Sequence, residues 1–158
     1  MIPMLKIFTA ATLTFAVLAS AETLRYEAED AIPADDHSVE IVSDANASGG
    51  SYVSMKEGNL LFTVTVSAAG FYTLWTNYQL PTKSGSKIQN LTVNGSSAGQ
   101  ISFGTSDAFT TIKGAGKIKL SAGTNTIGIV KSWGWVRLGK SFSVNSCTKS
   151  RFFHLPIG

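Results

Sequence analysis

Short stretches of alternating apolar and polar residues, separated by turn signals, constrain the fold of this 158-residue chain more than any other feature. In the clearest stretch, residues 60–66, every second side chain is large and apolar, and Ala69-Gly70 ends it before a second such stretch begins. Nowhere does an apolar period of 3.6 hold for three helical turns. Regular short strands with turns roughly every 8–12 residues predict an all-β fold, a β-sandwich of the jelly-roll type.

The predicted strands share either this alternation or an enrichment in aromatic and β-branched residues. They cover residues 24–29, 39–42, 52–55, 60–66, 71–78, 90–93, 100–103, 109–112, 117–120 and 124–130. From Gly139 onward the sequence changes character, with no clear strand beyond 140–144.

The two ends of the chain differ in composition from the strand-rich centre. Lys6, an apolar run over 7–18 and the small residues at 19–21 are typical of a secretory signal peptide, residues 1–21. No other apolar run approaches the ~20 residues of a membrane span. We therefore expect a secreted, extracellular product with no membrane partner. One domain should cover residues 22–138, followed by an atypical C-terminal tail, 139–158.

The charges are unevenly distributed, although the overall pI is 9.1. Nine of the ten acidic residues lie between Glu22 and Glu57, and several basic residues fall in the signal and the tail, so the body of the domain is nearly neutral. No basic face with interleaved aromatic residues is visible in the sequence, which argues against a nucleic-acid partner. The single cysteine, Cys147, excludes an internal disulfide.

Signatures of catalysis are scarce. The two histidines, His37 and His154, lie in a polar loop and in the tail, and no phosphate-binding or zinc motif is present. Glu27 and Glu29 are two apart in a predicted strand, so their side chains should point the same way, roughly 6–7 Å apart. Three interpretations are open for this pair, in descending order of preference: a Ca²⁺ site, a solvated strand face, and glycoside hydrolysis.

Two tryptophans flank a glycine in the segment 131–136, directly after the best strand pattern. Gly134 permits a sharp turn, and Trp133 and Trp135 offer flat apolar faces with polar N–H edges. Such faces suit a pyranose ring, which has an apolar C–H face and a hydroxylated rim. The alternative is that one or both indoles pack in the core.

Several motifs follow one another in an order that resembles the family 35 carbohydrate-binding modules, which are close relatives of family 6. The Trp-Gly-Trp version is most similar to the modules attached to β-mannanases of glycoside hydrolase family 26. The resemblance covers residues 26–138 and is carried by Tyr26-Glu27-Ala28-Glu29, Gly50-Ser51-Tyr52-Val53, the hairpin of 62–66 and 69–74, Val93-Asn94-Gly95, the segment 120–127 and the tryptophan segment.

The resemblance implies a jelly-roll sandwich that performs no chemistry and holds an attached glycoside hydrolase on its polysaccharide. It implies structural Ca²⁺ ligands at Glu27 and Glu29, and carbohydrate contacts at Trp133, Trp135 and Tyr78. Relatives carry an aspartate where this chain has Gly139, which predicts a weakened calcium site and a closing strand that is missing or altered, with reduced stability. A reading frame that departs from the ancestral one near Arg137, ahead of a lost catalytic domain, would account for this; it is a hypothesis.

The sequence thus predicts a monomeric, non-catalytic module for plant cell-wall polysaccharide, β-mannan or galactomannan, in a fragment of a mannanase-like protein. Two alternatives belong to other classes of protein. One is a small jelly-roll glycosidase that uses Glu27 and Glu29, and the other is a sandwich adhesion protein without a sugar site.

Overall fold

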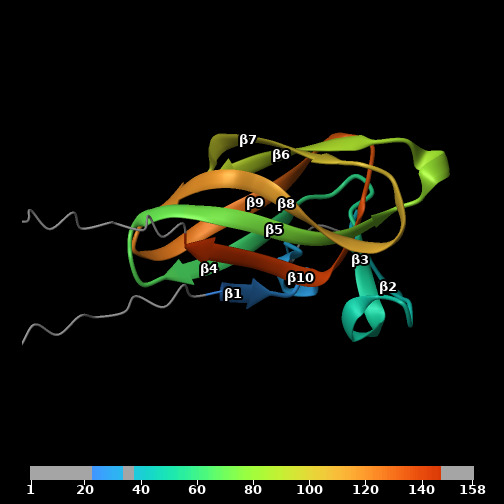
Figure 1. The fold of residues 1–158 in the computed structure, drawn as a ribbon, viewed down its shortest axis with the longest axis horizontal. Helices are drawn as coiled ribbons and strands as arrows, with labels where there is room; N and C mark the ends of the chain where they lie inside the picture. Colours follow the sequence, from blue (N-terminus) through green and yellow to red (C-terminus); the bar gives the residue numbers. More distant parts are fainter. Residues whose placement is uncertain (1–22, 34–37, 147–158) are drawn as a thin grey trace, which may run out of the picture.

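A computed structural model describes residues 23–33 and 38–146, which form two antiparallel β-sheets and no α-helix (Figure 1). The elements are ten strands and three short 3-10 helices, in the order β1 (Thr23–Tyr26), η1 (Glu29–Ala31), β2 (Glu40–Ser43), η2 (Ser48–Gly50), β3 (Ser51–Ser54), β4 (Leu60–Val66), β5 (Gly70–Leu80), η3 (Thr82–Ser84), β6 (Lys87–Val93), β7 (Ser96–Phe103), β8 (Ser106–Leu120), β9 (Gly123–Trp133) and β10 (Arg137–Ser146).

The two sheets form the two layers of a sandwich (Figure 1). The six-stranded sheet has the order β2-β3-β10-β5-β8, with β1 also paired to β10, and the four-stranded sheet has the order β4-β9-β6-β7. No described segment forms a helix long and apolar enough to cross a membrane. The prediction of an all-β jelly-roll sandwich is confirmed.

Alternation along the strands places the core between the layers. In β4, for example, every second side chain from Leu60 to Val66 is buried. Phe62 of β4 stacks on Phe142 of β10 with ring centroids 3.7 Å apart, and Tyr26 approaches Phe142 edge-on at 6.4 Å. Burial of these large aromatic side chains joins the two sheets.

One long strand replaces two predicted short ones. Residues 109–112 and 117–120 both belong to β8, which continues through Gly114 and Gly116. The register with β5 shifts at three places along the pair. Such irregularities let a strand pass glycines that would otherwise indicate a turn.

The closing strand is present in an altered form. β10 pairs with β3 and β5 through Arg137 and Leu138, and its register with β5 then shifts between Leu138 and Phe142. The strand crosses the boundary predicted after Leu138, and Phe142 and Val144 are buried in the core. The sandwich therefore continues to Ser146, and of the two predicted alternatives, a missing or an altered closing strand, the altered strand is the one observed. The predicted signal peptide and the rest of the tail lie outside the described residues.

Candidate functional site

The tryptophan segment connects the two sheets at one end of the sandwich. β9 of the four-stranded sheet ends at Trp133, and β10 of the six-stranded sheet begins at Arg137. Gly134 makes the turn with a φ of 72°, a conformation that favours glycine. Val136 is fully buried, and its carbonyl accepts a hydrogen bond from the Met55 amide at 3.2 Å. We call residues 132–136 the tryptophan loop.

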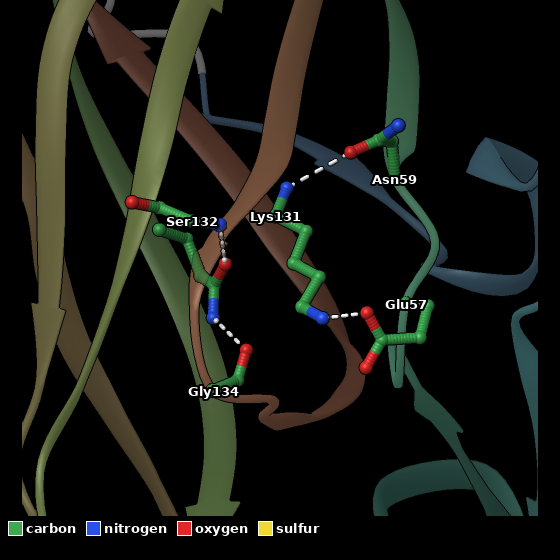
Figure 2. Close-up of polar contacts among 6 residues, drawn as sticks. Glu57, Asn59, Lys131, Ser132 and Gly134 are labelled. Carbon is green, nitrogen blue, oxygen red and sulfur yellow. Dashed lines mark hydrogen bonds and ion pairs between the residues drawn. The ribbon is translucent and has the colours of Figure 1, made fainter.

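A buried glutamine holds this loop from below. The Gln89 side chain, on β6, is 0% exposed. Its Oε1 accepts a hydrogen bond from the Ser132 amide at 2.9 Å, and its Nε2 donates to the Gly134 carbonyl at 3.1 Å (Figure 2). A buried side-chain amide without partners would be costly. The loop backbone satisfies this amide, so the loop and Gln89 stabilise each other.

A second anchor lies on the strand that leads into the loop. The Lys131 amide donates to Asn59 Oδ1 at 2.8 Å, and the Lys131 ammonium forms an ion pair with Glu57 (Figure 2). Asn59 and Glu57 belong to the connection between β3 and β4. The tryptophan loop is therefore held by β6 through Gln89, and the strand that leads into it is held by the connection between β3 and β4.

The two indoles lie against different sheets. Trp133 is 61% exposed, and the Lys87 ammonium of β6 lies 4.3 Å from its ring centroid. Trp135 is 37% exposed, and the Arg137 guanidinium of β10 lies 5.7 Å from its ring and 5.4 Å from the Tyr52 ring. Both indoles are thus available to a ligand, and the alternative that they pack in the core does not hold.

Lys87 occupies the space that Gly134 leaves open. A Cβ at position 134 would overlap the aliphatic part of Lys87. The Lys87 ammonium donates to the Ser84 carbonyl of η3, and Asp107 accepts hydrogen bonds from the Thr82 amide at 2.9 Å and the Thr82 hydroxyl at 2.7 Å. These two bonds lower the pKa of Asp107 below its usual value. A chain of contacts thus runs from Asp107 through η3 to Trp133.

Tyr78 does not join this surface, which corrects its predicted role in carbohydrate binding. Its side chain points inward from β5 and is 4% exposed. Its hydroxyl donates to the Gly104 carbonyl at 2.9 Å, and its ring meets Phe103 edge-on at 5.0 Å. Burial raises the pKa of the Tyr78 hydroxyl. Tyr78 is a core residue with a satisfied polar end.

Glu27 and Glu29 do not share a strand face. β1 ends at Tyr26, and Ala28 adopts helical angles (φ −67°, ψ −30°), so the chain leaves the sheet and Glu29 opens η1. Glu29 Oε1 accepts a hydrogen bond from the Ser51 hydroxyl at 2.8 Å. Glu27 is exposed and, with Asp30 and Arg25, lines an open hollow of about 330 Å³ next to Phe62. The strand spacing assumed for hydrolysis is therefore absent.

The described residues fit a calcium site only in part. Within 23–33 and 38–146, no group of three Asp, Glu, His or Cys side chains is close enough to hold a metal ion. No carboxylate side chain fits at Gly139 in this structure, because a Cβ there would overlap the amide oxygen of Asn77. Since Ca²⁺ takes six to eight oxygens, most ligands would have to be backbone carbonyls and water.

Sequence reasoning missed the residues that support the tryptophan loop. Gln89 shares the strand parity of buried Leu91, so its inward direction could have been inferred. Its partners Ser132 and Gly134 lie more than forty residues further along the chain. Nothing local to Lys87, Asn59 or Arg137 indicates a role at this end of the sandwich.

Comparison with known proteins gives relatives of one kind. The chain is 37% identical over 134 residues to mannan endo-1,4-beta-mannosidase A of Piromyces sp, covering 82% of this chain and 21% of that protein. It is 45% identical over 92 residues to mannan endo-1,4-beta-mannosidase B of the same source, covering 56% of this chain and 16% of that protein. The chain therefore spans about a fifth of the length of these relatives.

Solved structures show the same fold. The Podospora anserina GH26-CBM35 β-(1,4)-mannanase superposes with a TM-score of 0.66 at 26% identity, covering 82% of this chain and 29% of that one. A family 35 carbohydrate binding module from Clostridium thermocellum gives a TM-score of 0.65 at 22% identity, covering 78% of this chain and 98% of that one. The profile of the family named "Carbohydrate binding module (family 35)" matches residues 24–144. The chain belongs to the family 35 carbohydrate-binding modules.

Proposed function

We propose that this module binds a plant cell-wall polysaccharide, β-mannan or galactomannan, through the tryptophan loop, and that it directs a secreted mannanase-like glycoside hydrolase to that polysaccharide. The observation that carries the proposal is the pair of accessible indoles on a loop whose backbone is fixed by buried Gln89. The mannosidase relatives support the choice of mannan.

The geometry suits a sugar because it combines apolar faces with polar groups. Trp133 and Trp135 can stack on pyranose rings, while Lys87 and Arg137 provide hydrogen-bond donors next to each indole. Because the loop is already held, little conformational entropy is lost when a sugar binds. Each sugar hydroxyl is also well solvated in water, so we expect modest affinity.

We further propose that Glu27 and Glu29 contribute to a weakly bound structural Ca²⁺. Their position next to the shift in β10 supports a role in fixing β1, η1 and β3 to one another. The ion would neutralise carboxylates that lie close together in the sequence. It has no part in sugar binding, because the tryptophan loop is held by other residues.

Retention on insoluble polysaccharides tests the main proposal. The chain is incubated with mannan, cellulose and xylan, and a reducing-sugar assay is run on the same samples. We expect retention on mannan without release of sugar. Release of sugar would instead support the glycosidase alternative. A chain that is not retained and releases no sugar would support the adhesion alternative.

A double substitution locates the binding. Trp133→Ala with Trp135→Ala should abolish retention while the far-UV circular dichroism stays native, because neither indole belongs to the hydrophobic core between the sheets. Tyr52→Phe is a matched control that keeps an aromatic ring next to Arg137. Retention that survives the double substitution would refute the role of the loop.

A further inference from the structure

Three Asn-X-Ser/Thr triplets, the acceptor pattern for N-linked oligosaccharides, occur in the sequence and have no part in the tryptophan loop. They begin at Asn46, Asn90 and Asn94. The pattern alone does not distinguish them, because such triplets often arise by chance. In the folded chain they differ in the hydrogen bonds of the side-chain amide, whose nitrogen, Nδ2, is the atom that receives the sugar.

Two of these amides are already engaged. Asn46 Nδ2 donates to Asp44 Oδ1 at 3.1 Å, and the Asn46 backbone amide donates to the same oxygen at 2.9 Å. Asn94 lies in the turn between β6 and β7 with a φ of 50°. Its Nδ2 donates to Asn125 Oδ1 at 3.0 Å, and its Oδ1 accepts from the Thr126 amide at 2.8 Å. Each of these bonds uses the amide that an oligosaccharide would modify.

The amide nitrogen of Asn90 is not engaged in this way. Asn90 Oδ1 accepts a hydrogen bond from Gln100 Nε2 of β7 at 3.0 Å, which fixes the orientation of the amide. Its Nδ2 has no hydrogen-bond partner in the part of the chain that the structure describes. Asn90 lies on β6 between buried Gln89 and Leu91, so its side chain points away from the core. Thr92, which completes the triplet, shares this outward parity.

The outer face of the four-stranded sheet, on which Asn90 lies, carries almost no charge. The strands β4, β6, β7 and β9 contain two charged residues, Lys87 and Lys131, and both lie at the end next to the tryptophan loop. An oligosaccharide is likewise neutral and rich in hydroxyl groups. The side chains around Asn90 on this face are hydroxyl, amide or aliphatic ones, among them Leu61, Thr63, Gln100, Ser102, Thr126 and Val130.

The free edge of this sheet is uncharged as well. β7 is the last strand in the order β4-β9-β6-β7, and none of its residues, Ser96–Phe103, is charged. Native proteins commonly protect exposed strand edges with charged side chains or with a covering segment. The register places Asn90 opposite Gln100, one strand from this edge. A large group on Asn90 Nδ2 would therefore extend over the edge.

We propose that Asn90 is an N-glycosylation site and that its oligosaccharide covers the uncharged face and the β7 edge. The transfer breaks the anomeric C–O bond of a lipid diphosphate-linked oligosaccharide and forms a C–N bond to Asn90 Nδ2. Nδ2 loses one proton, and the lipid diphosphate is the leaving group. The proposal rests on export through a eukaryotic secretory pathway, and so on the secretion in the proposed function, but not on mannan binding.

Secretion from yeast tests the site. The full chain is produced behind a yeast export leader, and the oligosaccharide is released in heavy-oxygen water by an amidase that converts the modified asparagine to aspartate. Peptide mass spectrometry should find the heavy-oxygen label at Asn90. A secreted chain without oligosaccharide, or a label at Asn46 or Asn94 in place of Asn90, would overturn the proposal.

Electrophoretic mobility separates the triplets. Asn90→Gln and Thr92→Ala should migrate faster than the wild type, because each removes an essential group of the same triplet. Thr92→Ser keeps the hydroxyl and should retain the modification. Asn46→Gln is the matched control and should migrate as the wild type does. A mobility that is unchanged in Asn90→Gln would also overturn the assignment.

Sedimentation velocity tests the covering role on the same proteins. Asn90→Gln should self-associate at concentrations at which the glycosylated wild type does not, because a bulky, solubilising group is lost. Adding Gln100→Lys to this variant places a charge at the β7 edge and should suppress the association. Equal association of the wild type and Asn90→Gln would refute the covering role. Mannan retention reports the tryptophan loop separately, so failure of one proposal is distinguishable from failure of the other.

Discussion

The tryptophan loop leads directly into β10, and the segment with Glu27 and Glu29 follows β1, which pairs with β10. The two regions are nevertheless organised very differently. In the loop, Gln89 and Asn59 bind backbone amides and a carbonyl directly. In the carboxylate segment, the chain leaves the sheet after Tyr26, and Glu27 remains exposed. The loop backbone is therefore held by side chains from two other segments, whereas in the carboxylate segment the Ser51 hydroxyl holds the Glu29 side chain and Glu27 extends into solvent.

The largest expected effect concerns the core beneath the carboxylate segment. Phe142→Ala removes the ring that stacks on Phe62 and contacts Tyr26, and should lower the free energy of unfolding by about 3–5 kcal/mol. Urea denaturation measures it. Below the unfolding transition the variant should still bind mannan, since the tryptophan loop precedes β10 and Phe142 lies in the second half of that strand. A variant that loses binding while folded would break the distinction between the two regions.

The next effect addresses the support of the loop itself. Gln89→Met keeps the length of the side chain but leaves the Ser132 amide and the Gly134 carbonyl without partners, at a cost of about 1–3 kcal/mol. Mannan affinity should fall as well, because the loop must then be ordered on binding.

The same substitution at an exposed position is the control. Gln100 lies on β7, where its side chain bonds Asn90 at the surface. Gln100→Met should change stability by less than about 0.5 kcal/mol. Equal affinities for the two variants would show that Gln89 acts on stability alone.

Most of the fold could be predicted from the sequence, because strand alternation is a local signal. The stretch 60–66 and the hairpin that follows need no distant information. The two tryptophans of the loop were also predictable, since a glycine between indoles is visible locally. Gln89 was not, because its hydrogen bonds join residues far apart in the chain.

The errors have physical causes of the same kind. Strand alternation predicts one face for Glu27 and Glu29, but β1 ends at Tyr26 and Ala28 adopts helical angles between the two glutamates. Tyr78 was assigned to the ligand surface, although it shares the inward parity of Leu74. The closing strand lost the expected pattern at Gly139, and Phe142 restores the buried parity only after the shift in register.

Removal of calcium should have a smaller effect. If Glu27 and Glu29 bind Ca²⁺ without a third carboxylate, a chelator should lower the Tm by about 2–4 °C, corresponding to roughly 1 kcal/mol. Differential scanning calorimetry with and without chelator measures it, and Glu27→Gln with Glu29→Gln should remove the response. Mannan retention that depended on calcium would show that the carboxylate segment also supports the ligand site.

The smallest effect is a dependence on pH at η3. Because the folded pKa of Asp107 is lowered, its stabilisation of η3 is present above the unfolded pKa, about 4, and is lost as pH falls through the folded pKa. The Tm difference between the wild type and Asp107→Asn should therefore be seen at neutral pH and shrink below about pH 4. A difference that stayed constant across this range would contradict the role of the carboxylate.

Titration of soluble galactomannan into the wild type and Trp133→Ala, followed by calorimetry, tests the central claim most directly. Trp133 is largely exposed, so its removal should leave the Tm nearly unchanged. We predict saturable binding to the wild type and an affinity at least about tenfold lower in the variant. Equal binding by both proteins, or no binding by the wild type, would contradict the assignment of the tryptophan loop as the mannan site.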